Sequence, residues 1–531
     1  MQSEIHGPVT LDVREYGAVG DGATLDTRAL QAAIDACTAQ GGGTVLVPKG
    51  IYLTGTLVMR DNVTLYLMPD ATLLGSKDID DYVLEGEAAG RRNCLLYAQG
   101  ARNIALMGEG IIDGQGEAFP CVSRLGSIPA FRGEKPRMPE ERKKWPPRPM
   151  LIIFTKCEDV RVGGVTIKDS PSWGLHLVAC TRVWIEGTRV RNRARPNGDG
   201  IDLESCRHVF ISNCDISCDD DAICLKSSIA DLPCEHIVVT NCVISSNTAA
   251  VKFGTPSRAG FRDIVISNCA FYHCALGAVK LEAVDGGVLE EVVIDNIAMH
   301  EVEGPFFLRL GNRAARLHVP GVAREGYEPA DAPIPVGLLR NVMISNIRAT
   351  VRPVEVRDPM MRVDVDDKAK IGIMITGIPG YVVENVTLSD IHITFPGGGT
   401  REDAAIEVPE DERMYPEQFF FGALPAYGAY LRHVKGITFH NVRFDLAEPD
   451  LRPAIYAEDV EDLELSAFRA AGDVDADAVI RLVGARDVFV HGSRPLTQVS
   501  AFIRVEGGAP DEVVMSDNDV RLARTSLDLA D

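Results

Sequence analysis

The chain has 531 residues, of which 46% are hydrophobic and 24% are charged, a balance typical of globular proteins that excludes a disordered or fibrous chain. Its net charge of −22 argues against a nucleic-acid backbone or an anionic membrane as partner, because both need a basic face. No apolar run reaches the roughly 18 residues of a membrane span, and the first residues lack the layout of a secretory signal. We therefore expect a cytoplasmic location, or a secreted or periplasmic one if a signal peptide has been removed.

The first predicted element is a helix near the N-terminus. Apolar residues recur at helical spacing over residues 26–40, with Asp26 or Thr27 as the N-cap, and the pattern stops at the glycines of residues 41–43. Short strand patterns follow over residues 44–76. We expect the helix to cap the N-terminal end of the fold that these strands begin.

A phrase that recurs from the middle of the chain onward predicts the architecture. It is a β-branched run followed by Ser or Thr, then Asn and a small apolar residue, as in HVFISNCDI and HIVVTNCVI. Successive asparagines are 28, 27 and 28 residues apart at Asn213, Asn241, Asn268 and Asn296. Because the phrases alternate with the two-residue period of strands, we predict an all-β fold, a parallel β-helix in which each repeat is one rung and the asparagines stack at one turn.

The expected organisation is one domain in three parts: an N-terminal segment with the helix over 1–55, the β-helix over 56–510, and a C-terminal tail over 511–531. Segments rich in Pro, Gly and charge interrupt the rungs, and they either shape a binding cleft or are simple insertions; they cover 115–148, 303–338, and 351–370 together with 397–428. The thirteen cysteines have no metal-binding spacing and are expected to be buried thiols, so we predict no metal site and no cofactor.

Three aspartates mark the candidate active site. Asp199 and Asp220 are 21 residues apart, close to one rung, so we expect them on adjacent rungs of the same face, with Asp221 beside Asp220. Like charges in one patch repel each other, which raises the pKa of at least one carboxyl. This suits hydrolysis of a glycosidic bond, in which one carboxyl donates a proton and another activates water. A solvated acidic turn and a calcium site are the alternatives.

The sequence around these aspartates resembles glycoside hydrolase family 28, the polygalacturonase family. NGDGID at 197–202 is similar to the family's Asn-Thr-Asp motif, DDAICLKS at 220–227 to its paired-Asp motif, and SPSWGLH at 170–176 to its Ser-Pro-x-Trp segment. The likeness covers residues 9–300 and, more loosely, continues to about residue 450. It implies a right-handed parallel β-helix that hydrolyses pectic oligo- or polysaccharides with inversion. It also implies that Asp220 is the general acid, while Asp199 and Asp221 position and deprotonate the water.

The chain departs from the family where a galacturonate carboxylate is bound. TAA at 248–250 replaces Gly-His-Gly, and GAVKLE at 277–282 keeps only the lysine of Arg-Ile-Lys, so galacturonate-type and rhamnogalacturonan-type substrates both stay open. Lys252 and Lys280 are one rung apart and would form a substitute cationic pair for a carboxylate. For each candidate, the alternative is a structural role, as a packed aromatic or a paired base. The predicted substrate-binding residues are Asn197, Asp202, Trp173, His176, Lys252, Lys280, Arg309 and Tyr430.

Two other functions remain open from the sequence. A pectate-lyase-like β-helix would use calcium for elimination and leave an unsaturated product. A non-catalytic glycan-binding β-helix would explain the missing histidine. The spacing of Asp199, Asp220 and Asp221 favours hydrolysis over elimination, and the intact Asp220 and Asp221 argue against a non-catalytic protein. The long interrupting segments indicate a closed pocket and exo action on short oligomers.

Overall fold

The computed structural model describes residues 9–84, 93–119, 148–313, 334–353, 371–508 and 510–530. It divides into two compact units, which are the described residues up to 246 and those from 247 onward. Each unit is described by itself, and the expected single domain over the whole chain stays a prediction.

The first unit is built from short parallel strands that follow one another along the chain. They are β1 (Val9–Asp12), β2 (Asp21–Leu25), β3 (Gly43–Val47), β4 (Gly50–Thr54), β5 (Leu57–Val58), β6 (Val63–Leu67), β7 (Ala71–Gly75), β8 (Cys94–Gln99), β9 (Arg102–Gly108), β10 (Ile111–Asp113), β11 (Met150–Thr155), β12 (Glu158–Gly163), β13 (Thr166–Lys168), β14 (Leu175–Val178), β15 (Thr181–Glu186), β16 (Arg189–Asn192), β17 (Ile201–Glu204), β18 (Arg207–Ser212), β19 (Asp215–Cys218), β20 (Ile223–Ser227), β21 (Cys234–Thr240) and β22 (Val243–Ser246).

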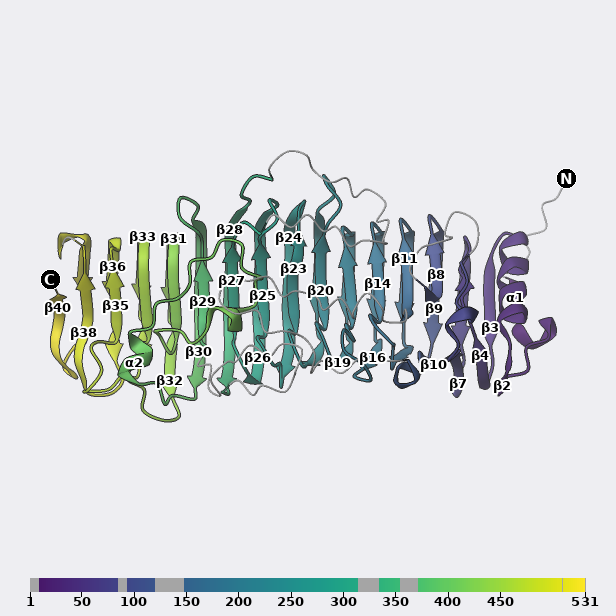
Figure 1. The fold of residues 1–531 in the computed structure, drawn as a ribbon, viewed down its shortest axis with the longest axis horizontal. Coiled ribbons are helices and arrows are strands. Elements are labelled where there is room, and N and C mark those ends of the chain that lie inside the picture. The colour runs from purple at the N-terminus through teal and green to yellow at the C-terminus, as the bar shows by residue number, and fades with distance from the viewer. Residues whose placement is uncertain are drawn as a thin grey trace. The chain divides into compact units, whose positions relative to one another are not determined.

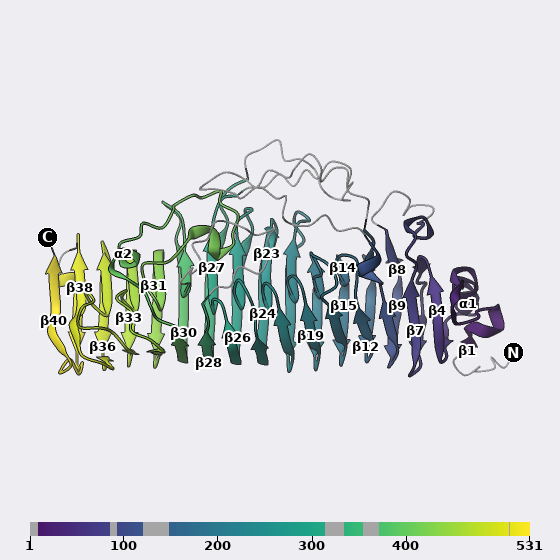
Figure 2. The same ribbon diagram turned by 60° about the horizontal axis from the view of Figure 1, so that its bottom comes forward.

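Pairing of every third strand makes this unit a parallel β-helix, as predicted. β14 pairs with β17 and β17 with β20, while β15 pairs with β18 and β18 with β21, all in parallel. The labelled strands of this unit follow one another in chain order in both views (Figures 1 and 2). Alternate residues face inward: Val183 and Ile185 of β15 are fully buried. Each rung therefore covers the apolar face of the next one.

The N-terminal helix α1 (Thr27–Ala39) forms where the sequence predicts it. The four residues that the periodicity places on its apolar side, Leu30, Ala33, Ile34 and Cys37, are the ones it buries. Asp26 stands at the N-cap, but its carboxylate accepts hydrogen bonds from the Val19 and Gly20 amides at 2.8 and 3.0 Å rather than from the helix. The helix packs on β1, β3, β5 and β6 at the start of the first unit (Figure 1). Across the described residues, no helix has both the length and the apolarity to cross a membrane.

The second unit continues the parallel pattern with several longer strands. They are β23 (Val251–Ser257), β24 (Gly260–Tyr272), β25 (Val279–Ala283), β26 (Val288–Val302), β27 (Phe306–Leu310), β28 (Leu338–Val351), β29 (Ile373–Thr376), β30 (Val383–Phe395), β31 (Ala429–His440), β32 (Arg443–Leu446), β33 (Ile455–Ser466), β34 (Arg469–Ala470), β35 (Ile480–Val483), β36 (Arg486–His491), β37 (Arg494–Pro495), β38 (Val499–Glu506), β39 (Val513–Ser516) and β40 (Ala523–Ala530), with the short helices α2 (Arg401–Ala404) and η7 (Gln418–Phe421) between β30 and β31.

Two predicted boundaries in this unit are wrong. Residues 511–531 are not a tail, because β39 pairs with β36 and β40 pairs with β38, so both extend the parallel ladders. The predicted loop over 303–338 contains β27, whose side chains are all buried. Residues 120–147, 314–333 and 354–370 of the predicted loops lie outside the described residues.

Stacked asparagines hold the turns within each unit, as the repeat predicts. The Asn241 amide donates to the Asn213 carbonyl at 3.4 Å, and the Asn296 amide donates to the Asn268 carbonyl at 2.8 Å. All four backbones are left-handed, with φ between 54° and 56°. Asparagine tolerates this conformation better than most residues, and its side chain bonds to the next rung as well.

Replacing Asn296 with alanine is expected to lower the free energy of unfolding by about 1–2 kcal/mol, because alanine loses the amide hydrogen bond and strains in the left-handed conformation. Asn296→Gly keeps the backbone relaxed and is expected to cost less. Urea denaturation of both variants checks this. Equal losses for the two would contradict the backbone argument.

Candidate active site

The three predicted catalytic aspartates lie at the beginning of two neighbouring strands. Asp199 precedes β17 by two residues, and Asp221 precedes β20 by the same number. Ile201 pairs with Ile223, so Asp199 and Asp221 hold equivalent places on adjacent rungs, with Asp220 beside them. The Gly200 amide donates to the Asp221 carbonyl at 3.0 Å, which joins the two turns. The spacing therefore predicted the adjacent rungs correctly, and the structure makes Asp221 rather than Asp220 the partner in register.

Glycine is required where these two turns meet. A Cβ on Gly200 would lie 2.4 Å from the Ala222 carbonyl oxygen, closer than atoms can pack. The second glycine of the NGDG sequence therefore lets the rung of Asp199 approach the rung of Asp221.

Asp220 is half-buried, and both of its carboxylate oxygens accept hydrogen bonds. The Asn197 side-chain amide donates to one oxygen at 3.1 Å, and the Asp221 backbone amide donates to the other at 3.0 Å. Its backbone carbonyl accepts from the Cys218 thiol at 3.0 Å and from the Ser246 hydroxyl at 2.5 Å. Asn197, one of the predicted binding residues, thus fixes the orientation of the Asp220 carboxyl.

Asp199, Asp202 and Asp221 are all buried, with exposed fractions of 3%, 0% and 6%. Burial raises the pKa of Asp199 well above its usual value, and the charges of Asp202, Asp220 and Asp221 raise it further. Burial also raises the pKa of Asp202, against the opposing effect of Lys226. Within the described residues, Oδ1 of Asp199 and Oδ2 of Asp202 have no hydrogen-bond partner. Each of these oxygens can therefore carry a proton or accept a hydrogen bond from an internal water molecule.

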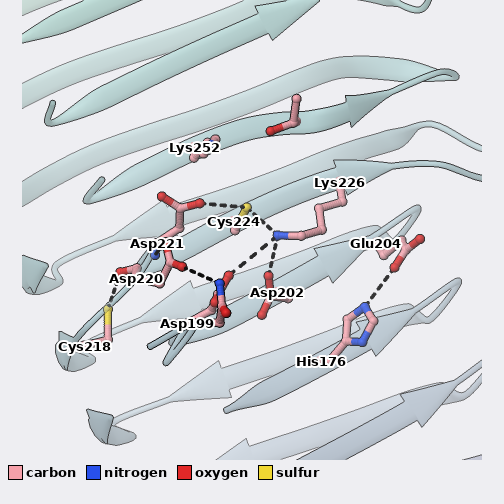
Figure 3. Close-up of polar contacts among 12 residues, drawn as sticks. His176, Asp199, Asp202, Glu204, Cys218, Asp220, Asp221, Cys224, Lys226 and Lys252 are labelled. Atoms are coloured by element: carbon pink, nitrogen blue, oxygen red, sulfur yellow. Dashed lines mark hydrogen bonds and ion pairs between the residues drawn. The ribbon is translucent and has the colours of Figure 1, made fainter. Parts of the chain in front are cut away.

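Lys226 is a member of this site that the sequence reasoning did not single out. Its ammonium lies 2.6 Å from Oδ1 of Asp202 and 3.9 Å from Oδ2 of Asp199 (Figure 3). Burial disfavours the charged ammonium, but the charges of Asp202, Cys224 and Asp199 outweigh burial and raise its pKa well above the usual value. A lysine inside the wholly buried strand β20 was the available signal, because such a charge needs an acidic partner on the neighbouring strand.

His176 and Trp173 border the same cluster. His176 Nε2 lies 2.9 Å from Oε2 of Glu204, whose other oxygen accepts from the Ser228 hydroxyl. The Trp173 ring meets the His176 ring edge-on at 5.0 Å and lies 4.7 Å from the Lys226 ammonium. Trp173 is only partly buried and packs on a cluster of Leu84, Cys94, Tyr97, Met150 and Ile153. The structure brings both residues to the aspartates, and their contact with a sugar stays a prediction.

In the second unit, Lys252 and Lys280 form the expected pair, but a protein carboxylate occupies it. The two lysines are neighbours in register on β23 and β25. One oxygen of Glu417 lies 2.6 Å from the Lys252 ammonium, and the other binds the Lys280 ammonium. Both lysines and Glu417 are almost completely buried. The pair thus binds the carboxylate of Glu417 within the protein, and its predicted role in binding a sugar carboxylate stays a prediction.

Arg309 and Tyr430 are also engaged within the second unit. The Arg309 guanidinium donates to Thr376 Oγ1 at 3.1 Å and to the Gly377 and Asp411 carbonyls at 3.0 Å. Burial lowers the pKa of Arg309 to about 10. The Tyr430 hydroxyl donates to Glu458 at 2.9 Å, and its ring is 1% exposed. Both side chains are therefore bound to other residues of the protein, and their predicted role in substrate binding stays a prediction.

Comparisons with known proteins identify the family of this chain. The profile of the glycosyl hydrolases family 28 matches residues 37–309, just over half of the chain. A probable polygalacturonase of Vitis vinifera is 27% identical over 362 residues, which is 64% of this chain and 69% of that protein. An exo-poly-alpha-D-galacturonosidase of Dickeya chrysanthemi is 26% identical over 336 residues, which is 55% of each chain.

The fold is also similar to that of a solved family 28 structure. A family 28 exopolygalacturonase of Yersinia enterocolitica superposes with a TM-score of 0.58 and 21% identity, over 86% of this chain and 78% of that one. This likeness confirms the predicted fold class, an all-β right-handed parallel β-helix. The matched range of residues 37–309 includes all three predicted catalytic aspartates. The chain therefore belongs to glycosyl hydrolases family 28 and is a glycosidase.

Proposed function

We propose that this protein hydrolyses the glycosidic bonds of a pectic oligo- or polysaccharide, of galacturonate or rhamnogalacturonan type, with inversion of configuration. One observation carries the proposal: Asp199 and Asp221 stand at equivalent positions on adjacent rungs, and Asp220 lies beside them with its carboxyl oriented by Asn197. The names of the relatives, polygalacturonase and exo-poly-alpha-D-galacturonosidase, support a pectic substrate.

In the proposed reaction, Asp220 donates its proton to the leaving glycosidic oxygen as the bond to the anomeric carbon breaks. A water molecule forms a new bond to that carbon from the opposite face, and its proton passes to Asp199 or Asp221. The raised pKa of Asp199 makes it a stronger proton acceptor at any pH at which it is ionised. The half-buried Asp220 is the carboxyl of the three with the greatest access to a ligand.

Exo action is part of the proposal. The relatives from Dickeya chrysanthemi and Yersinia enterocolitica are both named as enzymes of the exo type. An exo enzyme releases one short product from a chain end from the first turnover, whereas an endo enzyme gives a ladder of sizes.

A panel of oligogalacturonates, rhamnogalacturonan fragments and their carboxyl-reduced forms tests this proposal. Mass spectrometry and a reducing-end assay are expected to show saturated short products that appear from the start of the reaction and do not depend on added calcium. An ultraviolet-absorbing unsaturated product that disappears with chelator would mean elimination instead. Absence of cleavage across the panel would favour a binding protein.

A further inference from the structure

Lys226 is the cation that lies within the carboxylate cluster of the first unit. Its ammonium is 2.6 Å from Asp202 and 3.9 Å from Asp199, and 2.7 Å from the sulfur of Cys224 on its own strand (Figure 3). The face of the Trp173 ring lies 4.7 Å away and covers the ammonium. The residue is 6% exposed, so its charge acts through a medium of low dielectric rather than through water.

The charged groups around Lys226 come from each strand that packs against it within this unit. Asp199 and Asp202 come from the rung of β17, and Asp221 and Cys224 from its own rung; all four raise the pKa of the lysine. The next strand, β14, contributes His176, which lies on Glu204 of β17. Glu204 is bound to His176, whereas the carboxylates nearest to the Lys226 ammonium are those of Asp202 and Asp199.

Lys226 and Asp202 act on Asp199 in opposite directions. The carboxylate of Asp202 makes ionisation of Asp199 harder, whereas the ammonium of Lys226 makes it easier. Asp199 is buried, and its Oδ1 has no hydrogen-bond partner in the described part of the chain. Burial has the largest effect on the pKa of Asp199 and raises it, and the charged neighbours Asp202 and Lys226 then shift that pKa in opposite directions.

We propose that Lys226 is a positioning residue for hydrolysis: it binds Asp202, holds the two carboxyls of the β17 rung in place, and sets the pH above which Asp199 is ionised and able to accept the proton of the attacking water. Lys226 does not touch the reacting atoms in this proposal. Lys226 acts through Asp199, and this role rests on the proposed function.

Two substitutions with opposite expected effects test the proposal. Lys226→Met removes the charge that favours ionised Asp199, so the acidic limb of the kcat/KM profile is expected to move to higher pH by about one unit or more. At a pH on that limb, this is a loss of roughly tenfold or more. Asp202→Asn removes the charge that opposes ionisation while Lys226 stays, so the same limb is expected to move to lower pH.

The double variant Lys226→Met/Asp202→Asn removes one charge of each sign, and its acidic limb is expected to return toward that of the wild type. Lys435→Met is the matched control, because Lys435 is an exposed lysine of the second unit whose partner is Glu461. It is expected to leave the profile unchanged.

The outcomes distinguish failure of the proposed function from failure of the role of Lys226. A wild-type protein without hydrolytic activity on the pectic panel would overturn the proposed function itself. An active wild type whose acidic limb moves the same way, or not at all, in both single variants would overturn the role of Lys226 alone. If Lys226→Met does not fold, Asp202→Asn decides by itself: a shift to higher pH or no shift contradicts the proposal.

Discussion

Replacing Asp220 with asparagine is expected to lower kcat by about 10³-fold or more while the midpoint of thermal unfolding stays unchanged. Loss of a general acid typically costs about 10²–10⁴-fold. Asparagine has the same shape, and it can still accept the hydrogen bond that the Asn197 amide donates to Oδ2 at 3.1 Å. What it cannot do is release a proton to the leaving oxygen. Steady-state kinetics on a pectic oligosaccharide, with circular dichroism on the same samples, measures both quantities.

The neighbouring Asp219 supplies a matched control for this variant. It has the same side chain and is also partly buried, and its backbone amide donates to the Asn192 and Gly198 carbonyls, which a side-chain substitution leaves in place. Asp219→Asn is therefore expected to keep activity within about threefold of the wild type. If Asp220→Asn keeps full activity, or if Asp219→Asn loses as much, Asp220 is not the general acid.

The largest expected effect on stability comes from Glu417→Gln in the second unit. Glu417 bridges the ammonium groups of Lys252 and Lys280, and all three side chains are at most 4% exposed. A neutral glutamine leaves two buried positive charges with too little negative charge beside them. Breaking a buried pair in this way costs about 3–5 kcal/mol, which urea denaturation would register as a lower midpoint.

An exposed carboxylate with the same arrangement isolates the effect of burial. Glu461 also lies between two cations, 2.6 Å from Lys435 and 3.1 Å from Arg486, but its side chain is 38% exposed. Glu461→Gln is expected to leave the urea midpoint almost unchanged, because water screens exposed ion pairs. Equal losses in the two variants would show that Glu417 does not hold its segment through buried charge.

Local patterns along the chain were enough to predict much of the fold. The spacing of Asn213, Asn241, Asn268 and Asn296 gave the rung length, and α1 formed over the residues that the helical period selects. Strands β39 and β40 were missed because they lack the recurring asparagine phrase. Their place depends on pairing with β36 and β38, which is a property of the stack rather than of their own sequence.

The site was predictable where it depends on rung spacing and was missed where it depends on distant contacts. Asp199 and Asp221 are one rung apart, so the repeat alone brings them together. The pairing of Lys252 with Lys280 followed from the same spacing. Glu417, however, reaches Lys280 across 137 residues, and no periodic pattern predicts that contact. Arg309 likewise reaches Thr376 and Asp411, which are 67 and 102 residues away, and no local pattern predicts those contacts.

The configuration of the first-formed product tests most directly whether this acidic cluster activates water against a pectic glycoside. Proton NMR during cleavage of an α-linked galacturonide is expected to show the β anomer of the released sugar first, with the α anomer appearing only as the product equilibrates in solution. The α anomer as the first product, or an unsaturated sugar in place of both, would contradict direct displacement by a water molecule held at Asp199 and Asp221.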